Sequence, residues 1–390
     1  MLRIEEFQTV KKHIFGINAV GRIGKEVKIL GGKRVLIITD KGLASIGLLD
    51  DIIRILKNEQ IYFSVFDEVK PEPDLESYNN AVKFAKNERP DVIIGFGGGS
   101  SMDVAKVVSI MLNNRGEVMQ YVGPPFGTFQ NEGYPTILVP TTAGTGSECT
   151  QGSVIIVNGN KRDIADSKMF ATIAIVDPML TISMPQNLTA ATGIDALSHA
   201  LESLMSWRTT KLSYMLASEA VRLIFKYLRR AYRDGNDLES RYYMSLASTL
   251  AGMAISITST NLAHAAAYTY AGWKGTPHGV SCGIALPYAM EYYLPAVADK
   301  LATIAKEIGL CPHDVNEREA ALILIKSVRQ LICDLGLPTS LQEIGISRED
   351  IPTLILRLES LYQYIWEGGP MPLIKDRIKT FYEKMYEGVL

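Results

Sequence analysis

The sequence is short of cysteine and has no excess of either charge. Its four cysteines, Cys149, Cys282, Cys311 and Cys333, are scattered and form no CxxC pair, which argues against a disulfide framework and a cysteine zinc site. Free thiols are typical of a reducing compartment, so we expect a cytoplasmic protein. The 40 basic and 42 acidic residues form no basic run, and we therefore expect no nucleic-acid partner.

Long apolar segments are also scarce. The first 16 residues carry charges throughout, so they do not resemble a signal peptide. Residues 242–273 contain no Asp, Glu, Lys or Arg and are long enough to cross a bilayer. They are, however, rich in Ser, Thr, Ala and Gly and include Asn261 and His264. This composition favours buried helix in a globular domain over the alternative, a membrane span.

The chain length and its hydrophobic pattern predict two domains of different class. A chain of 390 residues favours two domains over one. In the first half, helical patterns alternate with β-rich runs at 34–38, 61–69, 91–96 and 136–139. In the second half, helical patterns dominate, at 187–205, 211–232, 238–255, 296–308 and 318–335. We expect an α/β, Rossmann-like domain with a mostly parallel sheet over residues 1–182 and an all-helical domain over residues 183–390.

A glycine-rich motif connects one predicted strand to one predicted helix. Gly97, Gly98 and Gly99 precede Ser100, and the motif runs on to Asp103. Glycines let backbone N–H groups approach an anion, and the helix N-terminus adds a favourable dipole. The motif is neither GxGxxG nor a Walker A loop. It predicts a pyrophosphate site, with Gly97, Gly98, Gly99, Ser100 and Asp103 as expected cofactor contacts, and the alternative is a plain strand–helix turn with a serine cap.

Two further features follow strands in the same half. Thr141 and Thr142 begin a loop of hydroxyls and glycines over residues 140–148, which is suited to phosphate, ribose or amide binding. Two such loops in one sheet indicate a ligand along the carboxyl ends of the strands. Asp40 lies just past the end of the first predicted strand, where an acidic side chain can bind ribose hydroxyls and repel a 2′-phosphate. A helix cap or Asx-turn is an equally good interpretation of Asp40.

The most specific signal is a set of metal-ligating residue types in the second half. Asp195 and His199 lie four residues apart in a helical pattern and so share one helix face. His264 lies in the uncharged run, and His278 follows Gly275-Thr276-Pro277. One carboxylate and three imidazoles suit iron(II) or zinc. The alternative for each histidine is a satisfied core residue, because spacing alone does not bring the segments together.

At these residues the chain resembles the iron-containing (group III) alcohol dehydrogenase family nearly end to end. The matching motifs are FGINAVGRIG at 15–24, GGGSSMDVAK at 97–106, VPTTAGTGSE at 139–148, AIVDPMLT at 174–181, ATGIDALSHALE at 191–202 and AGMA at 251–254, with His264 and His278.

The resemblance implies a role for particular residues. The metal ligands fall on Asp195, His199, His264 and His278. The cofactor contacts fall on the loop from Gly97 to Ser100, on Thr141 and Thr142, on Lys161 after a hairpin, on Leu180 beside the nicotinamide, and on Asp40, which favours NAD over NADP.

Three positions depart from the family pattern. Tyr268 stands where many members have a second histidine, residues 368–372 read Gly-Gly-Pro-Met-Pro in place of a GNPRP-like segment, and Asn18 replaces a common glycine. The first two line the family's active site. Tyr268 is therefore a candidate either for the proton path or for shaping the pocket, and we expect the second role because a phenol is a poor base near neutral pH.

The resemblance predicts an NAD(P)-dependent alcohol dehydrogenase that acts on a primary alcohol or small diol, with iron(II), or alternatively zinc, polarising the substrate oxygen. NAD(H) is expected over NADP(H), and a homodimer or larger homo-oligomer is expected. A polyol or glycerol-phosphate dehydrogenase and a phosphate-eliminating, dehydroquinate synthase-like lyase are alternatives of the same fold. A non-catalytic binding protein is the alternative of a different class.

Overall fold

The structure is a computed structural model that describes residues 4–390, apart from the side chains of residues 272 and 273. Its internal contacts divide the chain into two compact units. The sheet unit is Gln8–Ser183, and the helical unit is Met184–Leu390 together with residues 4–7.

The sheet unit alternates strands and helices along the chain. Its strands are β1 (Lys12–Phe15), β2 (Arg34–Ile38), β3 (Tyr62–Phe66), β4 (Val92–Gly97), β5 (Thr136–Pro140), β6 (Gly152–Val157), β7 (Asn160–Ala165) and β8 (Ile173–Val176). Its α-helices are α1 (Ile23–Ile29), α2 (Lys41–Ser45), α3 (Leu48–Asn58), α4 (Leu75–Glu88) and α5 (Gly99–Met111). Short 3₁₀ helices include η1 (Ala19–Arg22), η2 (Val118–Tyr121), η3 (Ser147–Cys149), η4 (Ser167–Met169) and η5 (Pro178–Thr181).

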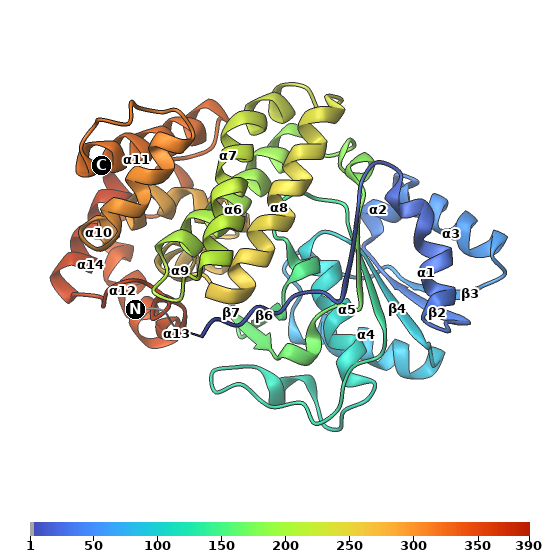
Figure 1. The fold of residues 1–390 in the computed structure, drawn as a ribbon. Helices are drawn as coiled ribbons and strands as arrows, with labels where there is room; N and C mark the ends of the chain where they lie inside the picture. The colour runs from blue at the N-terminus through green and yellow to red at the C-terminus, as the bar shows by residue number, and fades with distance from the viewer. Residues whose placement is uncertain (1–3) are drawn as a thin grey trace. The chain divides into compact units, whose positions relative to one another are not determined.

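Six of these strands form one parallel sheet in the order β1-β8-β5-β4-β2-β3, while β6 and β7 pair separately as an antiparallel hairpin (Figure 1). In the register, Ile38 of β2 lies opposite Gly95 of β4, and Gly97 of β4 lies opposite Pro140 of β5. The carboxyl ends of β2, β4 and β5 therefore lie together at one edge of the sheet. The predicted fold class, a parallel α/β sheet followed by a helical region, is confirmed.

Helices cover both faces of this sheet, because its strands are apolar on both sides. On one face, Val35 and Ile37 join a core cluster with Ile23 of α1 and Ile52 of α3. On the other face Gly95 leaves room for α5, since a Cβ placed there would lie 2.7 Å from the Cβ of Ala105. The central strands β2, β4, β5 and β8 are thus almost completely buried, whereas the edge strands β1 and β3 are partly exposed.

The sequence pattern located four of the six sheet strands. The predicted runs at 34–38, 61–69, 91–96 and 136–139 correspond to β2, β3, β4 and β5. The pattern did not predict β1 or β8, which have only four residues each. Runs this short carry little periodicity, and these two strands are defined by pairing with each other.

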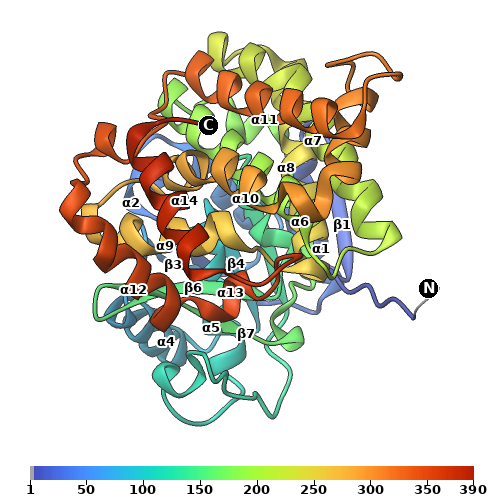
Figure 2. The ribbon, with the colours of Figure 1, turned by 90° about the vertical axis from the view of Figure 1, so that its left-hand side faces the viewer.

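The helical unit contains nine α-helices in the part of the chain that the structure describes. They are α6 (Gln186–Met205), α7 (Lys211–Arg233), α8 (Leu238–Thr258), α9 (Leu262–Lys274), α10 (His278–Glu307), α11 (Glu317–Asp334), α12 (Ile351–Leu361), α13 (Gln363–Trp366) and α14 (Lys375–Glu387). Two 3₁₀ turns, η6 (Gln342–Ile344) and η7 (Arg348–Asp350), separate α11 from α12. Helices α6, α7 and α8 run side by side in Figure 1, and α10 lies along α11 in Figure 2.

The uncharged run over residues 242–273 forms two helices rather than one span. Helix α8 ends at Thr258, Ser259 adopts a positive φ of 61°, and α9 starts at Leu262. Among the described residues, no helix combines the length and hydropathy that crossing a bilayer requires. The predicted helix over 296–308 is the second part of α10, which kinks at Val297 and so continues from His278.

Glycines let α10 approach α6 closely. A Cβ on Gly279 would lie 2.1 Å from the carbonyl oxygen of Ala191, and one on Gly283 would lie 2.8 Å from a methyl group of Ile194. On the opposite side of α6, a Cβ on Gly193 would lie 2.3 Å from Leu228 of α7. The neighbour of Gly279 is a backbone atom, which cannot yield as a flexible side chain can, so Gly279 sets the spacing of α6 and α10 most strictly.

We therefore expect Gly279→Ala to lower the free energy of unfolding of the protein by about 1–3 kcal/mol, the usual cost of overpacking. Chemical denaturation monitored by circular dichroism measures this change. Gly21→Ala is the matched control, because a Cβ on Gly21 meets no atom within 4 Å. Equal stability of the two variants would contradict this account of the α6–α10 contact.

Candidate metal centre and dinucleotide loops

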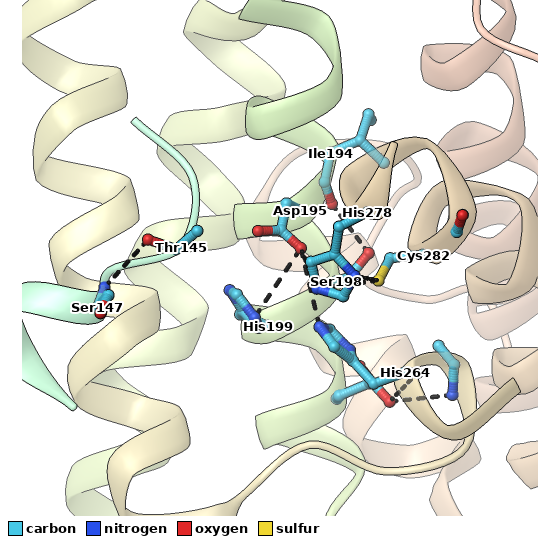
Figure 3. A network of polar contacts seen from close by, with 12 residues as sticks. Thr145, Ser147, Ile194, Asp195, Ser198, His199, His264, His278 and Cys282 are labelled. Atoms are coloured by element: carbon cyan, nitrogen blue, oxygen red, sulfur yellow. Dashed lines mark hydrogen bonds and ion pairs between the residues drawn. The ribbon is translucent and has the colours of Figure 1, made fainter. Parts of the chain in front are cut away.

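Three imidazoles surround one carboxylate oxygen in the helical unit (Figure 3). The Oδ1 atom of Asp195 lies 4.0 Å from Nε2 of His199, 3.8 Å from Nε2 of His264 and 3.6 Å from Nε2 of His278. Asp195, His199 and His264 are buried, and the side chain of His278 is 25% exposed. The structure thus brings together the four residues that the sequence nominated as metal ligands.

Three helices position these side chains. Asp195 and His199 share one face of α6, as their spacing predicted. His264 lies in the first turn of α9, which is capped by the side chain of Asn261. His278 is the first residue of α10, directly after Pro277. The cap at Asn261 and the proline at Pro277 fix the direction of the chain where α9 and α10 begin. They therefore help to place His264 and His278.

The geometry of this group fits a cation. The distances of 3.6–4.0 Å between the carboxylate and the imidazole nitrogens are too long for hydrogen bonds. Two ligand atoms that share a metal at about 2.0–2.2 Å are separated by roughly 3–4 Å. Asp195 Oδ1 and His264 Nε2 are buried and make no hydrogen bond to any described residue. Buried polar atoms normally have partners, so both atoms indicate a ligand between them.

Cys282 joins this group, and the sequence pattern did not nominate it. Ligand atoms of Asp195, His264, His278 and Cys282 all lie within 4.8 Å of one another. The thiol lies 3.7 Å from both ring nitrogens of His278, one helical turn earlier on α10. The i,i+4 spacing that paired Asp195 with His199 also relates His278 to Cys282, and would have identified the thiol. Burial raises the pKa of Cys282, and His264 opposes that shift.

Glu202 is a second functional candidate that the sequence reasoning missed. This carboxylate is completely buried on α6 and hydrogen-bonds Nδ1 of His264. Burial favours a raised pKa for Glu202, but the neighbouring His264 and backbone N–H groups hold this pKa below its usual value. Burial alone would lower the pKa of His264, but Cys282 and Glu202 raise it well above the ordinary value. Glu202 and His264 therefore interact directly through Oε2 and Nδ1 in a buried setting.

Tyr268 lies one helical turn after His264 on α9 and is only 6% exposed. Its ring centre is 6.5 Å from that of His264, 5.7 Å from that of His278 and 5.6 Å from that of Tyr362. Tyr268 is thus part of an aromatic wall beside the metal-ligand group.

In the sheet unit, the glycine-rich motif forms the junction of β4 and α5. Gly97 has a φ of 150°, a conformation that favours glycine, and a Cβ there would lie 2.6 Å from Oγ of Ser101. Gly98 is the N-cap of α5, and no side chain caps this helix among the described residues. Gly99 and Ser100 therefore belong to the first turn of the helix, whose N–H groups can bind an anion.

The second loop lies against the first. The backbone N–H of Thr141 donates to the carbonyl of Gly97 at 3.0 Å, and a Cβ on Gly98 would lie 3.7 Å from the side chain of Thr142. Asp40, at the end of β2, accepts a hydrogen bond from the N–H of Leu43 and caps α2. The cap interpretation of Asp40 is therefore realised in the structure, and it uses the Oδ1 atom.

Asp103 faces the protein interior. Its Oδ1 accepts a hydrogen bond from Oγ of Ser147 at 2.6 Å and pairs with Nζ of Lys106 at 3.0 Å, while its Oδ2 accepts from the N–H of Val154 at 2.9 Å. Both oxygens are thus engaged by protein donors. This geometry corrects the expectation of a direct cofactor contact, because Asp103 holds the second loop and β6 against α5.

The remaining cofactor candidates lie elsewhere in the sheet unit. Lys161 lies within the hairpin, in β7, rather than after it, and pairs with Glu72 at 2.6 Å while buried. Leu180 lies in η5 and belongs to the core cluster.

The C-terminal departure from the family pattern lines a pocket of about 320 Å³ in the helical unit. Its walls include Gly369, Pro370, Met371 and Pro372 from the GGPMP segment, with Trp207 and Trp366. The segment is held in part by Ser206, whose hydroxyl donates to the carbonyl of Gly368 at 2.8 Å.

Two family models match the chain. The model described as iron-containing alcohol dehydrogenase matches residues 11–178, and the model described as Fe-containing alcohol dehydrogenase family, C-terminal, matches residues 189–386.

Individual relatives match almost the whole chain. Long-chain-alcohol dehydrogenase 1 of Geobacillus thermodenitrificans is 36% identical over 96% of this chain and 95% of the relative. The 1,3-propanediol dehydrogenase of Citrobacter freundii is 34% identical over 90% of this chain and 91% of the relative. Among solved structures, a 1,3-propanediol oxidoreductase superposes with a TM-score of 0.94 at 32% identity, covering 98% of this chain and 100% of the other. Sulfoacetaldehyde reductase from Bifidobacterium kashiwanohense, in complex with NAD⁺, superposes with a TM-score of 0.88 at 26% identity, covering 98% and 99%.

Proposed function

This chain belongs to the iron-containing alcohol dehydrogenase family and is an oxidoreductase acting on CH–OH groups, and we propose that it interconverts a primary alcohol or small diol and the corresponding aldehyde. Relatives named for long-chain alcohols and for 1,3-propanediol support this substrate class. They also favour a dehydrogenase over the phosphate-eliminating alternative of the same fold. We further propose that NAD(H) is the cofactor and iron(II) the metal.

The observation that carries the proposal is the convergence of three imidazoles on the buried Oδ1 of Asp195. We assign Asp195, His199, His264 and His278 as the ligands of a divalent cation. When bound, this metal supplies a Lewis acid that polarises the substrate oxygen, and the nicotinamide supplies the hydride acceptor. The carboxylate offsets part of the metal charge, and burial of Asp195, His199 and His264 limits competition from water. Iron(II) follows the family, and zinc is the alternative metal for the same carboxylate and imidazole ligands.

We propose that residues 1–182 bind the dinucleotide and residues 183–390 bind metal and substrate. The uncapped start of α5, at Gly97, Gly98, Gly99 and Ser100, is suited to the pyrophosphate, and Thr141 and Thr142 add donors beside it. The lining role of Leu180 beside the nicotinamide and the contact of Lys161 follow from the family resemblance. The NAD⁺ complex of the similar sulfoacetaldehyde reductase supports the choice of NAD(H).

We also propose a cytoplasmic homo-oligomer, most simply a homodimer. Free thiols at all four cysteines suit a reducing compartment. The oligomer follows from the family resemblance alone, and light scattering of the purified protein would test it, since a monomer mass would exclude it.

The metal assignment predicts that Asp195→Ala and His264→Ala lose bound metal and activity while remaining folded. Each variant removes one of the four proposed ligands, and Asp195 Oδ1 and His264 Nε2 are the two buried ligand atoms that make no hydrogen bond to a described residue. Elemental analysis of the purified proteins, with circular dichroism as the folding check, measures both outcomes and identifies the native metal. His313→Ala, at an exposed histidine outside the group, is the control and should keep its metal. Full metal occupancy in Asp195→Ala and His264→Ala would overturn the assignment.

The cofactor assignment predicts that wild-type protein prefers NADH over NADPH and that Asp40→Gly narrows or reverses the ratio of kcat/KM values. Loss of the carboxylate removes the ribose contact and the repulsion of a 2′-phosphate. Because Asp40 also caps α2, Asp40→Asn separates the two roles: asparagine caps equally well but is uncharged. Asp40→Asn should therefore narrow the ratio as well. The control is Asp74→Asn at the cap of α4, which should leave the ratio unchanged. A wild-type preference for NADPH would refute this role of Asp40.

Tyr268 is proposed to shape the substrate pocket rather than to carry a proton. Its packing against His264, His278 and Tyr362 supports this role. Tyr268→Phe removes only the hydroxyl, so kcat should change little and the pH–rate profile should keep its form. Loss of a general base lowers kcat by about 10²-fold or more. A decrease of that size with a displaced profile would instead place Tyr268 on the proton path.

A further inference from the structure

We propose that Glu202 is a positioning residue for the metal centre: it fixes which nitrogen of His264 faces the metal and joins the two ligand-bearing helices α6 and α9. The inference rests on the proposed metal site and assigns a role to a residue outside the ligand set. Glu202 lies on α6 seven residues after Asp195 and three after His199. One helix face therefore carries two ligands and the carboxylate that holds a third.

The hydrogen bond between Glu202 and His264 determines the state of the imidazole. Oε2 of Glu202 lies within hydrogen-bond distance of Nδ1 of His264, and the carboxylate is completely buried. An ionised carboxylate only accepts hydrogen bonds, so Nδ1 must carry the proton. Nε2 is then available as a ligand, and it faces Oδ1 of Asp195 at 3.8 Å. Metal-bound histidines generally have such an outer carboxylate or carbonyl partner, which also increases their basicity.

The second oxygen of Glu202 holds the start of α9. Oε1 accepts hydrogen bonds from the backbone N–H groups of Asn261 at 2.9 Å, Ala263 at 3.0 Å and His264 at 3.2 Å. The side-chain amide of Asn261 in turn donates to the carbonyl oxygen of Glu202 at 2.9 Å. The first turn of α9 is thus attached to α6 at the turn that bears His264.

These contacts separate Glu202 from two other roles. It is not a further metal ligand, because both of its oxygens are already bound by donors of α9. It also differs from a simple helix cap, because a cap requires only Oε1 whereas the His264 contact uses Oε2. An experiment must therefore distinguish the effect on the imidazole from the effect on the helix.

Glu202→Gln makes this distinction. The amide oxygen of glutamine can still accept from the N–H groups of α9, but its NH₂ group donates to Nδ1 of His264. The imidazole proton then moves to Nε2, which can no longer bind a cation in that orientation. We expect the affinity for zinc(II) and cobalt(II) to fall by about 10- to 100-fold, the usual effect of losing such a partner. Competition with a chromophoric chelator measures the affinity, and the cobalt(II) absorption spectrum should change.

Two comparison variants complete the test. Asn261→Ala removes a cap contact of α9 but leaves the bond between Glu202 and His264, so it should lower the thermal midpoint while the cobalt(II) spectrum and metal affinity stay close to wild type. Glu26→Gln neutralises another fully buried carboxylate, in the sheet unit, and should leave metal affinity unchanged. If Glu202→Gln does not fold, Glu202→Asp, which keeps the charge but shortens the reach to Nδ1, should show the same loss.

The outcomes separate this inference from the metal assignment itself. If Asp195→Ala loses its metal but Glu202→Gln binds metal with wild-type affinity, the inference is overturned. The same holds for Glu202→Asp if that variant has to replace Glu202→Gln. If Asn261→Ala loses as much metal affinity as Glu202→Gln, Glu202 acts only as a helix cap, and the inference is again overturned. Retention of metal by Asp195→Ala would instead refute the proposed site.

Discussion

The carboxylate oxygen of Asp195 is buried among three imidazole nitrogens that are all too distant for a hydrogen bond. Burying a polar atom without a partner raises the free energy of the folded state, so this arrangement persists only where the surrounding helices enforce it. The same spacing is what a cation requires. Much of the helical unit can be understood as the framework that holds α6, α9 and α10 at the distances that this group needs.

Close packing and side-chain bonds supply that framework together. Gly279 and Gly283 let α10 lie against α6, directly after His278. Glu202 binds the start of α9 to α6 through its two oxygens. Packing alone would leave each imidazole free to rotate about its side-chain bonds, whereas a hydrogen bond to Nδ1 selects one orientation and one tautomer. The proposed metal ligands and the residues that support them are therefore parts of one network of contacts.

In the sheet unit, the proposed dinucleotide site is formed mainly by backbone groups. Parallel register places the carboxyl ends of β2, β4 and β5 at one edge, so that Thr141 bonds to Gly97 although the two are far apart in sequence. Buried side chains then brace these loops. Asp103 and Lys106 of α5 both bind Ser147, and Lys106 is almost completely buried. Glycine and serine at the helix start leave backbone N–H groups accessible, while the charged residues of the motif face inward.

The sequence alone determined the features that depend on near neighbours. Short β-rich runs located β2 to β5, helical patterns located α6, α7, α8 and α11, and the i,i+4 spacing placed Asp195 and His199 on one face. The resemblance to a family added the remaining ligands. Tertiary structure decided which distant segments meet: the pairing of the short strands β1 and β8, the contacts of Asp103 with Ser147 and Val154, those of Glu202 with α9, and the approach of Cys282 to Asp195 and His264. Local sequence restricts the backbone through sterics and hydrogen bonds within a few residues, whereas these contacts arise only when whole helices and strands pack and every buried polar group needs a partner.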